Sequence, residues 1–331
     1  MQEILPWQQK AWQYLLARKK LDKLPHAILI NGADGVGKGF FAKNFASFLL
    51  CQNSQDNTIA CGKCGSCELY KTDNHPDLII VGPDDKGKSI KIDQIRGLIA
   101  ELSNTAHFNG HRVVIVESAD LLNVAAANAL LKTLEEPFGN TVIILVSAHL
   151  AMLSATIRSR CQTVLLDTPK YFVAKEWLEK QLPEEDVELL LSLSENSPFK
   201  ALDLASGEGL SKRQKFLGDI LELEQGKINS VQMVKGNLKF GLENSISIFI
   251  YLVSDLIKIK LGATGNIVNR DQVTSLNNLV AKTTLEKLFF FKDSLYELRR
   301  HFARKINVNQ QMAMENLVIS WLELSVIPAR F

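Results

Sequence analysis

A glycine-rich turn, GADGVGKG from Gly32 to Gly39, lies between a short apolar run, HAILIN, and a helical pattern that begins at Lys38. This order of strand, turn and helix is the context that a phosphate-binding loop requires. The glycines of such a loop let backbone N–H groups surround phosphate oxygens, and its lysine reaches the same phosphates. The candidate nucleotide-binding residues are therefore Gly32, Gly35, Gly37 and Lys38. The alternative is a purely structural turn with a surface lysine.

The loop lacks the hydroxyl group that normally binds Mg²⁺, because Gly39 stands where the pattern requires Ser or Thr. The strand pattern at residues 112–116 is followed by Glu117 and Ser118. ATPases of this type place a metal-binding carboxylate at the end of that strand and, in many families, a water-activating carboxylate after it. Glu117 could still hold a metal, but Ser118 cannot activate water. We therefore predict negligible ATP hydrolysis by this chain, and at most weak ATP binding through Lys38.

Apolar runs alternate with helical patterns in the first half of the chain. Four of the runs contain β-branched residues and predict buried strands, at residues 26–31, 77–81, 112–116 and 141–146. Helical patterns precede or separate them, at residues 7–20, 38–50, 92–102 and 124–136. Continuous apolar strands between helices predict a parallel sheet that is covered on both faces. The predicted fold class of this part is α/β.

The chain has 331 residues, about twice the size of an ordinary domain, so more than one domain is expected. Strand patterns stop after about residue 166, and short helical patterns with breaks at Pro183 and Pro198 follow. From Ser211 onward the pattern is helical to the end. The predicted division is an α/β domain at residues 1–166, a small helical domain at 167–208 and a larger all-α domain at 209–331.

The charge balance excludes two classes of protein. The formal net charge is +2, from 38 Lys and Arg against 36 Asp and Glu, so the chain is neither a histone-like basic binder nor an acidic solvating chain. The first twenty residues contain no apolar core of a secretory signal. The uncharged run at residues 141–157 contains Ser147 and His149, which favours a buried strand and a short helix over a membrane span. We expect a soluble, cytoplasmic protein with no membrane partner.

Four of the five cysteines gather in a short segment, in the pattern C-x₉-C-x₂-C-x₂-C formed by Cys51, Cys61, Cys64 and Cys67. A secreted disulfide scaffold would be much shorter, with its cysteines spread along the chain, so a reduced compartment fits better. Thiolates at x₂ spacing can turn back onto one ion, and four of them make a closed, structural Zn²⁺ site. His75 is close enough in sequence to be a rival ligand. A loop of free thiols and an Fe–S cluster are the remaining alternatives.

Several motifs together resemble a known family. The phosphate loop comes first and a four-cysteine insertion follows its helix, as residues 51–67. Then come NALLKTLEEP, from Asn128 to Pro137, and the triplet Ser-Arg-Cys that contains Arg160. In this order they resemble subunits of the bacterial DNA polymerase III clamp loader, which belongs to the AAA+ proteins. The resemblance runs from about residue 24 to residue 161 and continues more loosely to the C-terminus.

The resemblance implies an architecture and a set of partners. The α/β part would be a RecA-like domain with an inserted zinc module, the small helical domain a lid, and the C-terminal domain a collar that joins five subunits in a ring. The implied partners are the ATPase subunits gamma and tau, the delta subunit, the sliding clamp and primed DNA. The chain would then work in DNA replication within a DNA-directed DNA polymerase, a nucleotidyltransferase, without catalytic activity of its own.

The resemblance also changes the interpretation of Arg160. By its chemistry alone, an arginine after a short helix is usually a solvated charge. In this family the implied role is an arginine finger, supplied in trans to the ATP site of a neighbouring subunit. Such fingers raise turnover by roughly 10³- to 10⁵-fold in nucleotide hydrolases. The alternatives are an active ATPase subunit of the same loader and a small P-loop kinase, which the cysteine insertion and the helical C-terminal half fit poorly.

Two further positions, Ser147 and Phe199, depart wholly or in part from the pattern of the ATPase members of the family. Ser147 stands where those members carry a polar phosphate sensor, and Phe199 stands where a second sensor arginine would align, with Lys200 beside it. The expected cofactors are therefore structural Zn²⁺ at the four cysteines and ATP that is bound weakly at most and not hydrolysed.

Overall fold

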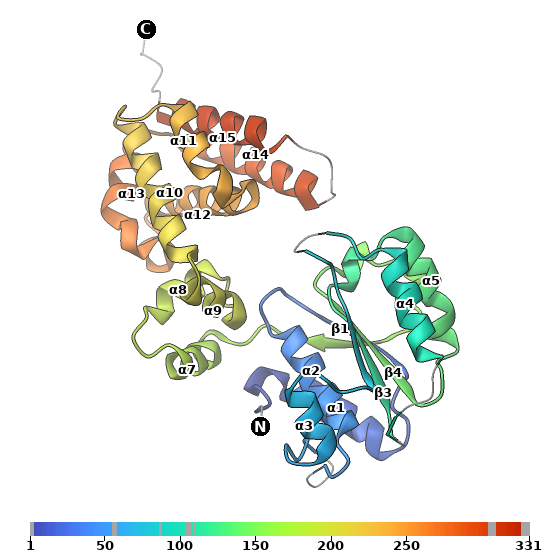
Figure 1. Cartoon of the computed structure of the whole chain (residues 1–331). Coiled ribbons are helices and arrows are strands. Elements are labelled where there is room, and N and C mark those ends of the chain that lie inside the picture. The colour runs from blue at the N-terminus through green and yellow to red at the C-terminus, as the bar shows by residue number, and fades with distance from the viewer. Residues whose placement is uncertain are drawn as a thin grey trace. The chain divides into compact units, whose positions relative to one another are not determined.

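The computed structural model describes residues 3–54, 58–85, 88–103, 107–108, 110–303 and 309–325 (Figure 1). The chain divides into two compact units, residues 1–177 with 196–200, and residues 178–195 with 201–331. Helices α7 (Tyr171–Gln181) and α9 (Pro198–Ser206) each contribute residues to both units. The predicted domain boundaries at residues 166 and 208 stay a prediction.

The first unit is built on one parallel sheet of five strands, in the order β2-β3-β4-β1-β5. The strands are β1 (Ala27–Gly32), β2 (Leu78–Val81), β3 (Arg112–Val116), β4 (Thr141–Ser147) and β5 (Gln162–Leu166). Strands β3 and β4 are buried along their whole length, as the apolar runs predicted. In the register, Leu29 of β1 pairs with Leu145 on one side and with Thr163 on the other. The predicted α/β fold with a parallel sheet is confirmed.

Helices cover both faces of this sheet (Figure 1). Alternate residues of a strand point to opposite faces, so Ile28 and Ile30 enter one core while Ala27 and Leu29 enter the other. The first core contains α1 (Gln9–Lys20) and α2 (Lys38–Leu50), and the second contains α4 (Ile92–Leu102), α5 (Val124–Glu135) and α6 (Ala155–Arg158). Helix α3 (Gly65–Lys71) and the 3-10 helices η1 (Pro6–Gln8), η2 (Ala119–Leu121) and η3 (Leu150–Met152) complete the helices of this unit.

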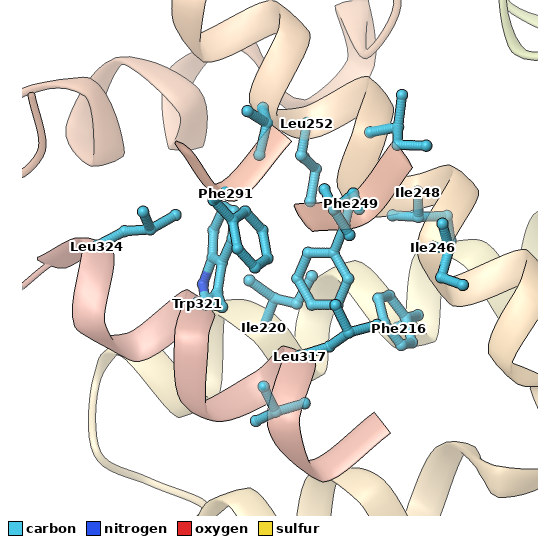
Figure 2. Packing of buried hydrophobic residues seen from close by; sticks show 14 of the residues in the cluster. Phe216, Ile220, Ile246, Ile248, Phe249, Leu252, Phe291, Leu317, Trp321 and Leu324 are labelled. Atoms are coloured by element: carbon cyan, nitrogen blue, oxygen red, sulfur yellow. The ribbon is translucent and has the colours of Figure 1, made fainter. Parts of the chain in front are cut away.

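The second unit is entirely helical within the described residues. Its helices are α8 (Val187–Leu193), α10 (Gly209–Glu224), α11 (Ser230–Asn237), η4 (Leu238–Phe240), α12 (Leu242–Lys260), η5 (Thr264–Asn266), η6 (Arg270–Gln272), α13 (Val273–Val280), α14 (Leu285–Ala303) and α15 (Gln310–Ser325). Phe249 of α12 lies at the centre of their core, among Phe216, Phe291 and Trp321 (Figure 2). The helical patterns in the C-terminal part of the sequence therefore build one aromatic-rich core.

Among the described residues, none of the helices taken singly has the length and apolar character to cross a membrane. Two consecutive helical segments, Ser230–Phe240 and Leu242–Lys260, are together long and apolar enough, but the chain bends by 113° between them.

Candidate functional site

The glycine-rich turn joins a strand to a helix, and two of its glycines have left-handed backbone angles. Strand β1 ends at Gly32, and α2 begins at Lys38 directly after the turn. Gly35 and Gly37 have φ angles of 77° and 83°, in the left-handed region that favours glycine over residues with a Cβ atom. Strand, turn and helix thus follow the predicted order, and four candidate residues, Gly32, Gly35, Gly37 and Lys38, lie within this one loop.

The lysine of the loop is already paired inside the chain. Lys38 is only 8% exposed, and its Nζ donates to the carbonyl oxygens of Gly32, at 2.9 Å, and Ala33, at 2.8 Å. The same Nζ lies 3.5 Å from Oδ1 of Asp34, a carboxylate of the loop itself. Burial lowers the pKa of Lys38, and the negative charge of Asp34 partly offsets this effect. The partners of the lysine are therefore two carbonyl oxygens and a carboxylate of its own loop.

Residues 196–200 of the same unit pack against the loop glycines. The backbone N–H of Phe199 donates to the carbonyl oxygen of Gly35 at 2.9 Å. A Cβ atom built at Gly35 would lie 2.7 Å from Cγ of Lys200, and one built at Gly37 would meet the Phe199 ring. Residues of the chain itself therefore occupy the space next to both glycines. In a functional phosphate-binding loop, phosphate oxygens lie close to such glycines.

Aromatic contacts fix residues 196–200 against the loop. The Phe199 ring lies 5.7 Å from Phe40 of α2 and 5.5 Å from Trp177 of α7, measured between ring centroids. Trp177 in turn meets Trp7 edge to face at 5.4 Å, and the indole N–H of Trp7 donates to the carbonyl oxygen of Val36 in the loop, at 2.9 Å. Phe199, noted in the sequence only as a departure from a sensor arginine, is thus part of an aromatic cluster over the loop.

Two residues that the sequence marks as possible magnesium and sensor positions, Glu117 and Ser147, have partners within the chain. Glu117 follows β3, and its Oε1 lies 3.0 Å from Nζ of Lys43 on α2. Ser147 is fully buried, and its hydroxyl accepts a hydrogen bond from the backbone N–H of His149 at 3.1 Å. At Gly39, by contrast, a Cβ atom would meet nothing within 4 Å. Packing therefore leaves room for the hydroxyl that this loop lacks.

Arg160 lies at the surface, between α6 and β5, and its side chain is 32% exposed. Its Nε donates to Oε1 of Glu135 at 2.5 Å, and Nη2 pairs with the same oxygen. Nη1 donates to the carbonyl oxygen of Thr156 at 2.9 Å. Glu135 is the last residue of α5 and was not predicted as a partner. No local spacing could have found it, because the two residues are 25 positions apart.

The four clustered cysteines come together as predicted. Within the described residues, the Sγ atoms of Cys51, Cys61, Cys64 and Cys67 all lie within 4.8 Å of one another. The distances are 4.0 Å between Cys51 and Cys64 and 3.9 Å between Cys61 and Cys67. A tetrahedral Zn²⁺ with bonds of about 2.3 Å places its sulfur ligands about 3.8 Å apart. The four thiols therefore fit a closed zinc site.

His75 lies outside this group and has partners for both ring nitrogens. Nδ1 accepts from the backbone N–H of Asp77 at 3.1 Å, and Nε2 lies 2.7 Å from Oγ of Ser66. Since the Ser66 hydroxyl donates to the carbonyl oxygen of Leu50 at 2.6 Å, Nε2 is the donor to Ser66. Burial lowers the pKa of His75, which favours this neutral form. His75 thus connects the cysteine module to β2 and leaves the four thiols as the ligand set.

Protein purified without chelator is expected to contain about one equivalent of zinc, and Cys67→Ser is expected to reduce this below half an equivalent. The serine hydroxyl replaces one of four thiolates and is a poor zinc ligand. Elemental analysis by plasma mass spectrometry measures the zinc content. Cys161→Ser is the matched control, because Cys161 lies outside the cluster. Iron in place of zinc, or less than half an equivalent in the wild type, would contradict the assignment.

Comparisons with known proteins agree over nearly the whole chain. A family model described as DNA polymerase III, delta subunit, matches residues 7–170, and one described as DNA polymerase III, delta subunit, C terminal, matches residues 207–323. The chain is 32% identical to DNA polymerase III subunit delta' of Pseudomonas aeruginosa, over 98% of this chain and 99% of that protein. The corresponding protein of Escherichia coli is 35% identical, over 63% of each chain.

Among solved structures, a DNA polymerase III gamma subunit-related protein from Thermotoga maritima is similar at 21% identity, with a TM-score of 0.46. The match covers 94% of this chain and 99% of that one.

Proposed function

The chain belongs to the delta' subunits of DNA polymerase III, and from that premise we propose that it serves the clamp loader as a subunit that hydrolyses no ATP itself. In this role it supports ATP-dependent loading of the sliding clamp onto primed DNA during replication. Arg160 enters the ATP site of a neighbouring ATPase subunit, gamma or tau, as an arginine finger. The delta subunit is a further partner in the ring.

One observation carries the proposal that this chain does not hydrolyse ATP. The groups that would bind ATP and magnesium already contact other residues of the same chain. Asp34 is the counter-ion of Lys38, Phe199 covers the loop glycines, and Glu117 is paired with Lys43. ATP would have to displace the first two, and a magnesium ion would have to compete for the third. Phosphoryl transfer depends on positioned metal and water, so ATP binds weakly at most and is not turned over.

The exposure of Arg160 supports its role in trans. A finger must reach a phosphate on another subunit, and Arg160 keeps about a third of its side chain accessible while its neighbour Ile157 is fully buried. The buried residue fixes the short helix, and the arginine stands beyond it. A planar guanidinium that is charged at all working pH values suits the charge that develops in phosphoryl transfer.

The remaining parts of the proposal follow the family. Zinc held by the four cysteines would be structural, because closed coordination leaves no position for a substrate. Residues 1–166 would form the RecA-like domain, 167–208 the lid and 209–331 the collar for ring assembly. The protein would work in the cytoplasm, where reduced cysteines persist.

The isolated chain is expected to turn over ATP at less than about 0.1 s⁻¹, well below ordinary enzyme rates. Gly39→Ser should leave this background unchanged, although it restores the missing hydroxyl in a place with no steric obstruction. The reason is that Ser118 still cannot activate water and Lys38 still pairs with Asp34. Phosphate release by the purified chain measures both rates, with a gamma subunit as the positive control. Faster turnover by the wild type would favour the alternative, an active ATPase subunit of the same loader.

A further inference from the structure

The guanidinium of Arg160 is held by a carboxylate to which no role has been assigned. We infer that Glu135 is a positioning residue, which orients Arg160 before it meets the phosphate of the neighbouring subunit. This inference rests on the proposed function of Arg160. It assigns a supporting role in that function to a second residue, Glu135 of α5.

The contacts of the guanidinium leave part of it available. Arginine has five N–H groups. Two of them make hydrogen bonds, from Nε to Oε1 of Glu135 and from Nη1 to the carbonyl oxygen of Thr156, while Nη2 forms the ion pair with the same Glu135 oxygen. One N–H on each terminal nitrogen therefore has no partner among the described residues. Two such groups are what a guanidinium needs to bind two oxygens of a phosphate. Glu135 thus holds Arg160 without consuming the groups that the finger would use.

The backbone segments that carry Glu135 and Arg160 are both anchored in the hydrophobic core. Helix α5 is anchored beside Glu135 by Leu134, which is 1% exposed, and α6 is anchored beside Arg160 by Ile157, which is fully buried in the same core. The hydroxyl of Ser154 caps α6 by accepting from the backbone N–H of Ile157 at 3.3 Å. The backbone positions of Glu135 and Arg160 are therefore fixed relative to each other, so their contact sets the direction of the guanidinium.

The Glu135–Arg160 ion pair is strong enough to orient the guanidinium but too weak to keep it from a phosphate. Glu135 is 48% exposed and Arg160 is 32% exposed, and ion pairs exposed to this extent are weak because solvent screens them. A weak pair can shift as a phosphate approaches. An arginine that is already restricted in its rotamers also loses less conformational entropy when it binds. The expected result of the contact is a finger that is oriented in advance and still able to move.

The test compares variants of this chain in the reconstituted loader with clamp and primed DNA, with the ATPase sites that this chain does not face inactivated. Glu135→Ala is expected to lower the kcat of ATP hydrolysis roughly three- to tenfold, by misplacing Arg160, while KM for ATP stays unchanged because the neighbour binds ATP. Glu135→Gln should recover most of the loss, since its amide oxygen can still accept from the guanidinium. Glu136→Ala is the matched control and should match the wild type, because Glu136 is the next residue and is exposed.

The Arg160→Ala background separates failure of this inference from failure of the proposed function. If Arg160→Ala leaves turnover unchanged, the proposed function itself is wrong. If Arg160→Ala lowers turnover, Glu135→Ala should add nothing further in that background. An equal loss from Glu135→Ala in both backgrounds, no loss in either, or a gain in turnover would overturn the positioning role alone. Assembly of each loader is checked by size-exclusion chromatography, and folding of each chain by its thermal transition.

Discussion

Replacing Arg160 with alanine is expected to lower ATP hydrolysis at the neighbouring ATP site by about 10³-fold, the loss that its proposed role as an arginine finger predicts. The guanidinium would no longer stabilise the charge that develops on the transferred phosphoryl group. The variant should still assemble, because Arg160 is part of the surface and its partner Glu135 is itself half exposed. Steady-state phosphate release by the reconstituted loader, with the other ATPase sites inactivated, isolates the site concerned.

Arg158→Ala is the matched control for this prediction. Arg158 is an exposed arginine two residues away, at the end of the same short helix, and its loss removes the same charge. A finger acts through position, so Arg158→Ala should leave turnover close to that of the wild type. If both variants lost activity equally, the effect would be one of net charge and not of a positioned guanidinium.

Phe249→Ala is expected to destabilise the all-helical unit by about 3–5 kcal/mol. Phe249 is fully buried and contacts three aromatic rings, with centroids 5.5 Å away at Phe216, 5.8 Å at Phe291 and 5.3 Å at Trp321 (Figure 2). Truncation removes the apolar surface and leaves a cavity that these rings cannot fully close. Differential scanning calorimetry of the variant should show the transition of this unit at a clearly lower temperature.

Phe290→Ala provides the comparison for the core variant. Its ring belongs to α14, next to Phe291, but it is 78% exposed. Substitutions at such positions usually change the free energy of unfolding by less than about 0.5 kcal/mol. Similar losses from Phe249→Ala and Phe290→Ala would mean that the aromatic cluster is not the core of this unit.

The sequence predicted those parts of the fold that short-range patterns determine. The apolar run, glycine turn and helix around Lys38 were recognisable because each needs only neighbouring residues to define it. The four cysteines were likewise found by spacing alone. Strand β5 was not predicted, because it is a five-residue edge strand that begins with the exposed Gln162 and Thr163. Only pairing with β1 makes this segment a strand.

The contacts that decide the chemistry were beyond the reach of local patterns. Phe199 lies more than 160 positions from the loop that it covers, and the sequence marked it only as a departure from an expected arginine. Glu135 is a charged residue at a helix end, where solvation is the usual expectation. Its pairing with Arg160 depends on how α5 and α6 pack. Such contacts join distant segments, so only the folded chain brings them together.

The central claim is that this chain contributes an arginine to ATP hydrolysis and does not use its own phosphate-binding loop. Lys38→Met and Arg160→Ala, placed separately in the reconstituted loader with clamp and primed DNA, test both halves in one measurement of ATP turnover. The account predicts that the Lys38→Met loader assembles and turns over ATP like the wild type, whereas the Arg160→Ala loader assembles and loses the turnover of the facing site. Full activity with Arg160→Ala, together with a loss caused by Lys38→Met, would contradict it.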